Sequence, residues 1–186
     1  ICTPTERAAD LHLQPLPGSD AALAFALLHV LWRDGLLDHD FINAHTLGWD
    51  ELEPRLVDCT PAWGEAMTGV PARLIEETAR LYGQGPSLLW LGQGLQRQPM
   101  GGNVMRACAL LPAVTGNLGK PGAGVLYLNW NLAQRHIDET YLTVPHLCTD
   151  GLPRISHMDL AACLDDPART QALLAWNINI AASNPQ

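Results

Sequence analysis

Apolar and polar positions form distinct blocks around the middle of the chain. Residues 87–91 are an apolar run that predicts a short buried β-strand, and a polar segment containing Gly92 and Gly94 follows it through Gln98. The apolar stretch 104–114 then predicts a helix. In open α/β sheets, ligands bind at the carboxyl ends of the strands, where the chain turns toward the next helix. We therefore expect a glycine-lined ligand crevice directly after the strand.

Helical patterns also occur on both sides of this central region. Residues 21–34 are apolar nearly all the way round, which predicts a buried helix with Ser19 or Asp20 as its N-cap. Residues 70–83 are apolar on one face and predict an amphipathic helix. Shorter helices are predicted within 38–68 and 157–164.

Three further segments have strand-like patterns, namely 11–16, 125–129 and 172–176. Residues 130–156 lack a firm periodicity and predict a long loop. Pro112 is expected to kink or interrupt its helix, because it has no N–H and clashes with the preceding turn. Helices and strands alternate along the chain, so we predict an α/β, Rossmann-like fold with a largely parallel sheet and helices on both faces.

Composition narrows the class of protein. Of the 186 residues, 47% are hydrophobic and only 16% are charged, which indicates a folded chain with a real core. The formal net charge of -8 argues against a nucleic-acid partner, since phosphate recognition needs a basic surface. No apolar run approaches the roughly 20 residues that a membrane helix needs. The 5 cysteines are widely spaced and form no C-x-x-C pair, so no zinc or cluster site is indicated.

The two ends of the sequence resemble neither a complete start nor a complete end. The chain begins at Ile1 without an initiator Met or a signal peptide, and it ends within a turn-rich segment at Gln186. We expect an internal piece of a longer protein. The sequence does not indicate its cellular compartment.

Known catalytic and nucleotide-binding patterns are incomplete. Gly92-x-Gly94 resembles the opening of a dinucleotide fingerprint, but Arg97 stands where its third glycine belongs. Gly119-Lys120 is followed by Pro121 and does not form a phosphate-binding P-loop. No nucleophile elbow or H-E-x-x-H motif is present, and the paired carboxylates at 76–77 and 165–166 are expected to be solvated surface residues. From its residues alone, the chain is an α/β domain with a glycine-lined ligand crevice.

An ordered set of motifs nevertheless resembles the molybdopterin oxidoreductases, the family of dimethyl sulfoxide reductase, formate dehydrogenase and periplasmic nitrate reductase. The motifs are 17–23 (PGSDAAL), 68–72 (TGVPA), 92–94 (GQG) and 115–124 (TGNLGKPGAG). The resemblance covers 1–186 and implies two interior domains. Residues 1–121 are the C-terminal part of an α/β cofactor-binding domain, and 122–186 begin an incomplete adjoining α/β domain.

The resemblance also implies a cofactor and its contacts. Such enzymes bind molybdenum or tungsten through two pterin guanine dinucleotides, and a 4Fe-4S cluster is expected upstream of this chain. The Gly18-Ser19-Asp20 turn is similar to the family's guanosine-binding turn, in which the aspartate accepts hydrogen bonds from guanine. The implied cofactor-binding residues are Thr3, Gly18, Ser19, Asp20, Gly92, Gln93, Gly94, Arg97, Asn177 and Asn179.

Several of these residues have a structural alternative. Ser19 and Asp20 also suit a helix cap, and Asn177 and Asn179 also suit a turn. In the motif at 115–124, Gly116, Asn117 and Gly119 are expected to shape a helix C-terminus rather than to contact cofactor.

No catalytic or metal-ligating residue is expected in this chain, because the family's metal ligand and cluster cysteines lie upstream. In the formate dehydrogenases, an arginine follows the Gly-Lys-Pro segment by about ten residues. Between Pro121 and Arg135 this sequence has no arginine, which argues against formate as the substrate. The resemblance implies a small-molecule substrate and an electron-transfer subunit as partners. Two alternatives are a cofactor-less scaffold, like the large subunit of respiratory complex I, and an ordinary nucleotide-binding α/β enzyme.

Overall fold

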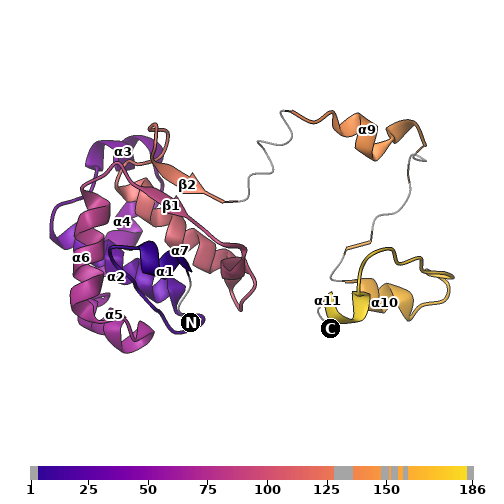
Figure 1. Ribbon diagram of the computed structural model, residues 1–186, viewed down its shortest axis with the longest axis horizontal. Coiled ribbons are helices and arrows are strands. Elements are labelled where there is room, and N and C mark those ends of the chain that lie inside the picture. The colour runs from indigo at the N-terminus through magenta and orange to yellow at the C-terminus, as the bar shows by residue number, and fades with distance from the viewer. Residues whose placement is uncertain (1–3, 128–135, 148–150, 152–154, 157–158, 184–186) are drawn as a thin grey trace. The chain divides into compact units, whose positions relative to one another are not determined.

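The computed structural model describes residues 4–127, 136–147, 151, 155–156 and 159–183 (Figure 1). The chain divides into two compact units, unit 1 at residues 1–133 and unit 2 at 134–186. The boundary that the sequence predicts between residues 121 and 122 stays a prediction. Among the described residues, no helix is both long enough and apolar enough to cross a bilayer.

Unit 1 begins with a series of helices and ends with a small sheet (Figure 1). The helices before the sheet are α1 (Pro4–Ala8), α2 (Asp20–Arg33), α3 (His39–His45), α4 (Trp49–Leu52), the 3₁₀ helix η1 (Glu53–Asp58), α5 (Pro61–Thr68) and α6 (Ala72–Gly83). The remaining elements are β1 (Leu88–Trp90), the 3₁₀ helix η2 (Gln93–Gln96), α7 (Gly101–Val114) and β2 (Gly124–Leu126).

The two described strands of unit 1 are parallel, and the chain passes from β1 to β2 through α7. The register pairs Leu88 with Gly124, Leu89 with Val125 and Trp90 with Leu126. A parallel pair needs such a crossover connection, which is the β-α-β unit of α/β proteins. The predicted α/β class with a parallel sheet is confirmed.

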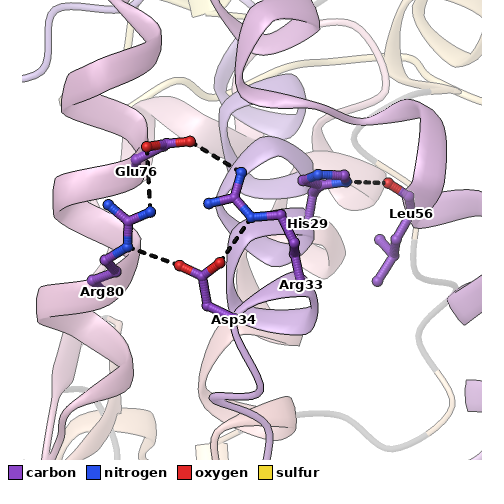
Figure 2. Close-up of polar contacts among 6 residues, drawn as sticks. All are labelled: His29, Arg33, Asp34, Leu56, Glu76 and Arg80. Atoms are coloured by element: carbon purple, nitrogen blue, oxygen red, sulfur yellow. Dashed lines mark hydrogen bonds and ion pairs between the residues drawn. The ribbon is translucent and has the colours of Figure 1, made fainter.

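Helix α2 lies at the centre of unit 1 and packs against α5, α6 and α7. Its buried residues surround most of the helix, as its apolar pattern predicted: Ala24, Ala26, Leu28, His29, Val30 and Leu31. The Nδ1 atom of His29 lies 2.7 Å from the carbonyl oxygen of Leu56 (Figure 2). A carbonyl only accepts, so Nδ1 carries the proton and donates. His29 is therefore a hydrogen-bonded core residue.

A closed ring of ion pairs joins the C-terminal end of α2 to α6 (Figure 2). Arg33 lies 2.8 Å from Asp34 and 3.0 Å from Glu76, and Arg80 lies 2.8 Å from Asp34 and 3.3 Å from Glu76. The hydrogen bond from Arg33 is the largest cause that lowers the pKa of Asp34 and of Glu76. The four side chains are between 23% and 47% exposed, so solvent screens these pairs and each contributes little.

The ring predicts a modest loss of stability in acid. The pKa values of Asp34 and Glu76 in the folded protein lie below their ordinary values of 3.8 and 4.5, respectively. Their contribution to the stability of the fold is therefore complete when the pH is above those ordinary values. It is lost as the pH falls below those values toward the folded ones. Thermal unfolding midpoints measured from pH 6 to about pH 3 should fall less steeply in an Asp34→Asn, Glu76→Gln double variant than in the wild type. Glu77→Gln is the matched control, and an equal slope in the double variant would contradict this prediction.

Helix α7 ends in a Schellman motif centred on Gly116. The N–H of Asn117 donates to the Pro112 carbonyl at 2.9 Å, the N–H of Gly116 donates to the Ala113 carbonyl at 3.4 Å, and Gly116 has a φ of +59°. The prediction that Gly116 shapes a helix C-terminus is confirmed. Pro112 does not end the helix at its own position, since α7 continues to Val114.

The side chain of Asn117 ties this helix end to the start of β1. Its Oδ1 accepts from the Ser87 N–H at 3.1 Å, and its Nδ2 donates to Thr115 Oγ1 at 2.8 Å. Asn117 is only 3% exposed, so its amide has exchanged water for these partners. The asparagine of the 115–124 motif is thus structural in this chain.

Two predicted strands are wrong, and the N-cap predicted at Ser19 or Asp20 is confirmed in its position but not in its side-chain bond. Residues 11–16 and 172–176 are irregular, and 172–176 is exposed, with Trp176 at 86%. A strand needs a neighbouring edge for a series of hydrogen bonds, and neither segment forms such a ladder in the described structure, although the Leu16 N–H donates to the Thr68 carbonyl at 2.8 Å. Ser19 occupies the N-cap position of α2, but its hydroxyl donates to the Leu16 carbonyl, and Asp20 is already the first helical residue.

Unit 2 contains only short described helices (Figure 1). They are α9 (Glu139–Thr143), the 3₁₀ helix η3 (Pro145–Leu147), α10 (Leu160–Leu164) and α11 (Ile180–Ser183). The prediction of a structureless loop is therefore wrong for 139–147, while the helix predicted within 157–164 is confirmed by α10. Residues 128 and 129, where the strand expected at 125–129 was to end, lie outside the described residues.

Candidate functional site

Two turns that are distant in sequence meet at one surface pocket of unit 1. The pocket has a volume of about 390 Å³. Its lining residues are Pro17, Gly18, Asp20, Gly92, Gly94, Leu95 and Gln98. The first three come from the turn that enters α2, and the last four come from the loop between β1 and α7.

The first turn is closed by local hydrogen bonds. The N–H and the hydroxyl of Ser19 donate to the Leu16 carbonyl, at 3.1 Å and 2.6 Å. Gly18 has a φ of +83°, a left-handed conformation that residues with a side chain rarely adopt. The turn therefore needs glycine at position 18. It leads directly into α2, whose first residue, Asp20, lines the pocket.

The second loop leaves the carboxyl end of β1 and is open on its pocket side. The N–H of Leu91 still donates to the Leu126 carbonyl at 2.9 Å, after which the chain turns into η2. A Cβ atom added at Gly92 or at Gly94 would meet no atom within 4 Å. These two glycines are therefore not required by contacts within the described protein. They leave space in which a ligand can approach the backbone.

The end of this loop is held tightly against the start of α7. The N–H of Gly101 donates to the Gln98 carbonyl at 2.9 Å. A Cβ atom at Gly101 would lie 2.2 Å from the Gln96 carbonyl oxygen, so only glycine fits there. Gln98 consequently has a well-defined backbone position on the pocket wall.

Asp20 is the only acidic residue that lines this pocket in the described part of the chain. Its Oδ2 accepts from Gln98 Nε2 at 3.3 Å, and its Oδ1 makes no hydrogen bond to another described residue. Cys108 is buried nearby, and burial followed by the charge of Asp20 raises the pKa of its thiol. The thiol of Cys108 therefore stays protonated at neutral pH. Because Oδ1 of Asp20 has no partner among the described residues, it is the carboxylate oxygen that the pocket offers to a ligand.

Comparison with known proteins identifies the family. The family described as molybdopterin oxidoreductase matches residues 1–182. This chain belongs to the molybdopterin oxidoreductases. The motifs at 17–23, 68–72, 92–94 and 115–124 are thus those of a true member, and the resemblance predicted from them is confirmed.

The chain is similar to much longer members of the family. It is 41% identical over 125 residues to the F420-dependent formate dehydrogenase 1 subunit alpha of Methanococcus maripaludis, covering 66% of this chain and 18% of the relative. It is 30% identical over 185 residues to the probable oxidoreductase YoaE of Bacillus subtilis, covering 98% of this chain and 27% of the relative. The chain thus spans about a quarter or less of the length of these relatives.

A solved structure supports the fold. Acetylene hydratase from Pelobacter acetylenicus matches with a TM-score of 0.61 and 24% sequence identity. The match covers 64% of this chain and 16% of the other. At this level of identity the likeness concerns the fold alone.

The pocket brings together part of the set of cofactor-binding residues that the family resemblance implied. Gly18, Asp20, Gly92 and Gly94 line it, whereas Ser19, Gln93 and Arg97 lie in the same two turns without lining it. Arg97 Nη2 donates to Gln93 Oε1 at 3.4 Å, and both side chains are exposed beside the pocket. The Arg97 guanidinium and the Gln93 amide are therefore accessible to a ligand that extends out of the pocket.

The remaining predicted site residues are outside the described part of unit 1. Thr3 is outside the described residues. Asn177 and Asn179 belong to unit 2 and are exposed, and Asn177 has a φ of +53°, a turn conformation that asparagine tolerates. Their cofactor contacts stay predictions.

Three pocket residues were missed by the sequence analysis, namely Pro17, Leu95 and Gln98. The signal for Gln98 was weak, since it is one of several amides in a polar loop. The described residues contain no group of three or more histidine, cysteine, aspartate or glutamate side chains that could hold a metal ion.

Proposed function

We propose that this chain supplies cofactor-binding loops to an oxidoreductase that holds molybdenum or tungsten through pterin guanine dinucleotides. The guanosine end of one dinucleotide would bind in the pocket between the 17–20 turn and the 92–98 loop. The observation that carries the proposal is that these two turns, which both match family motifs, converge on one pocket with a single acceptor carboxylate at Asp20.

The residues of the pocket fit such a ligand. Guanine presents adjacent N–H donors, and the Oδ1 of Asp20 is an acceptor without a partner in the described chain. The open space beside Gly92 and Gly94 suits a flat ring system or a phosphate close to the backbone. The first residue of α2, Asp20, lines the pocket, and the N–H groups at a helix N-terminus favour negative charge. Arg97 is exposed and would donate charge-assisted hydrogen bonds to a phosphate outside the pocket.

The work of this chain is to bind and orient, while the redox chemistry belongs to the cofactor. When bound, the metal centre supplies two-electron redox chemistry or oxygen-atom transfer on a small-molecule substrate. The proposal places the metal's protein ligand and a 4Fe-4S cluster outside this chain, and electrons leave to a separate electron-transfer subunit. Thr3, Asn177 and Asn179 are proposed to contact the dinucleotides as well.

Direct analysis of the purified full-length protein tests this function. Metal analysis should find molybdenum or tungsten, and acid hydrolysis should release GMP in proportion to the metal. If the metal is present with CMP or without a nucleotide, the guanine assignment is wrong, but the protein would still be a pterin-dependent enzyme. The absence of both metal and nucleotide from protein made with molybdate and tungstate available would instead support the cofactor-less scaffold.

A further inference from the structure

The side chain of Gln98 connects the two walls of the pocket. Its Nε2 donates to Asp20 Oδ2 at 3.3 Å, across the pocket wall, and to the Leu95 carbonyl at 3.1 Å within its own loop. The contact with Asp20 joins two residues that are 78 positions apart in sequence. Gln98 is partly buried, so the two bonds are partly shielded from water.

Chemistry determines which way this amide faces. A carboxylate and a backbone carbonyl can only accept, so the nitrogen of Gln98, not its oxygen, must lie toward Asp20 and Leu95. Both N–H groups are thereby used. The oxygen, Oε1, lies on the side of Gly18, where a Cβ atom added at Gly18 would be 3.5 Å away.

The backbone of Gln98 cannot shift easily, because its carbonyl accepts the Gly101 N–H and Gly101 has no room for a side chain. The amide is therefore presented from a fixed position. Asp20 is partly buried, and the bond from Gln98 is the one side-chain hydrogen bond that its carboxylate makes among the described residues, so Gln98 helps to hold its rotamer.

We propose that Gln98 is a positioning residue for the cofactor pocket. It holds Oδ2 of Asp20 so that Oδ1 is directed to the ligand. This inference rests on the proposed function, because the ligand is the guanosine end of the dinucleotide. A carboxylate oxygen held in one direction selects a base edge that presents N–H donors to it, as guanine does.

The test measures GMP per protein after acid hydrolysis in the full-length protein, with thermal unfolding as the check on folding. The variants are Gln98→Ala, Gln98→Glu and Asp20→Asn, together with Gln98→Ala combined with Asp20→Asn. Gln84→Ala, an exposed glutamine at the end of α6, is the matched control. Gln98→Ala should lower the GMP content about tenfold, as expected for a bond to a charged group. Gln98→Glu should lower it further, because it retains the size but places a carboxylate against Asp20 and the Leu95 carbonyl.

The combined variant separates positioning from independent binding. If Gln98 acts through Asp20, Gln98→Ala should change the GMP content much less in the Asp20→Asn background than in the wild type. An equal fold-change in both backgrounds would overturn the positioning role. A normal GMP content in Gln98→Glu would overturn it too, while a loss in Asp20→Asn would still uphold the proposed function. An unchanged GMP content in Asp20→Asn would contradict the proposed function itself.

Discussion

Replacing Asp20 with alanine should lower the cofactor content of the full-length protein by about tenfold or more. The reason is that the pocket would lose its only described acidic acceptor, and Gln98 would lose the partner that its Nε2 faces. The fold should survive, because the Asp20 side chain does not cap α2 and its favourable interaction with the helix dipole is worth only about 0.3–1 kcal/mol. The measurement is metal and GMP per protein, set beside the thermal unfolding midpoint.

Asp50→Ala is the control for this variant. Asp50 is also in the first turn of a helix, α4, but is exposed and away from the pocket lining. It should change neither metal nor GMP content. If Asp20→Ala keeps a full complement of both, the guanosine assignment is wrong.

Replacing Gly116 with alanine should destabilise the protein by about 3–5 kcal/mol. Gly116 has a φ of +59°, and a Cβ atom there would lie 2.2 Å from Asp38 Oδ2 and 2.8 Å from Asp38 Cγ. Asp38 would have to move, although its Oδ1 caps α3 by accepting from the Phe41 N–H at 2.9 Å. Left-handed strain, overpacking and a lost cap therefore act together. The measurement is the unfolding midpoint and the soluble yield of the full-length protein.

Gly119→Ala separates the two contributions to this loss of stability, namely the steric contact with Asp38 and the strain of a left-handed backbone. Gly119 also has a positive φ, of +80°, but a Cβ atom there would meet nothing within 4 Å. It should cost only about 1–2 kcal/mol. Equal losses for the two variants would show that the contact with Asp38 contributes nothing.

Local patterns were sufficient for much of the fold. The apolar periodicity of residues 21–34 and 70–83 predicted α2 and α6, and the apolar run at 87–91 predicted β1. These predictions succeed because helix and strand periods, together with glycine at helix ends, are set by residues close in sequence. The same patterns failed at 11–16 and 172–176, because a strand depends on a partner strand that can lie anywhere in the chain.

The motifs likewise indicated where the ligand pocket would form, but not how it is assembled. Gly18, Asp20, Gly92 and Gly94 were recognisable as two separate turns in the sequence. Ser19 resembled a helix cap and instead uses its hydroxyl to close the preceding turn. Gln98 had no distinguishing local feature, since its importance comes from a hydrogen bond to a residue far away along the chain.

The sequence by itself determined the family, the α/β class, the central buried helix and the two turns that carry the candidate site. Only the tertiary structure showed that these turns share a pocket, that Gln98 joins them, and that Gly116 lies against Asp38. The physical reason is that propensity and periodicity act over a few residues, whereas pockets, hydrogen bonds between distant residues and steric clearance exist only after α2 and α7 have packed together.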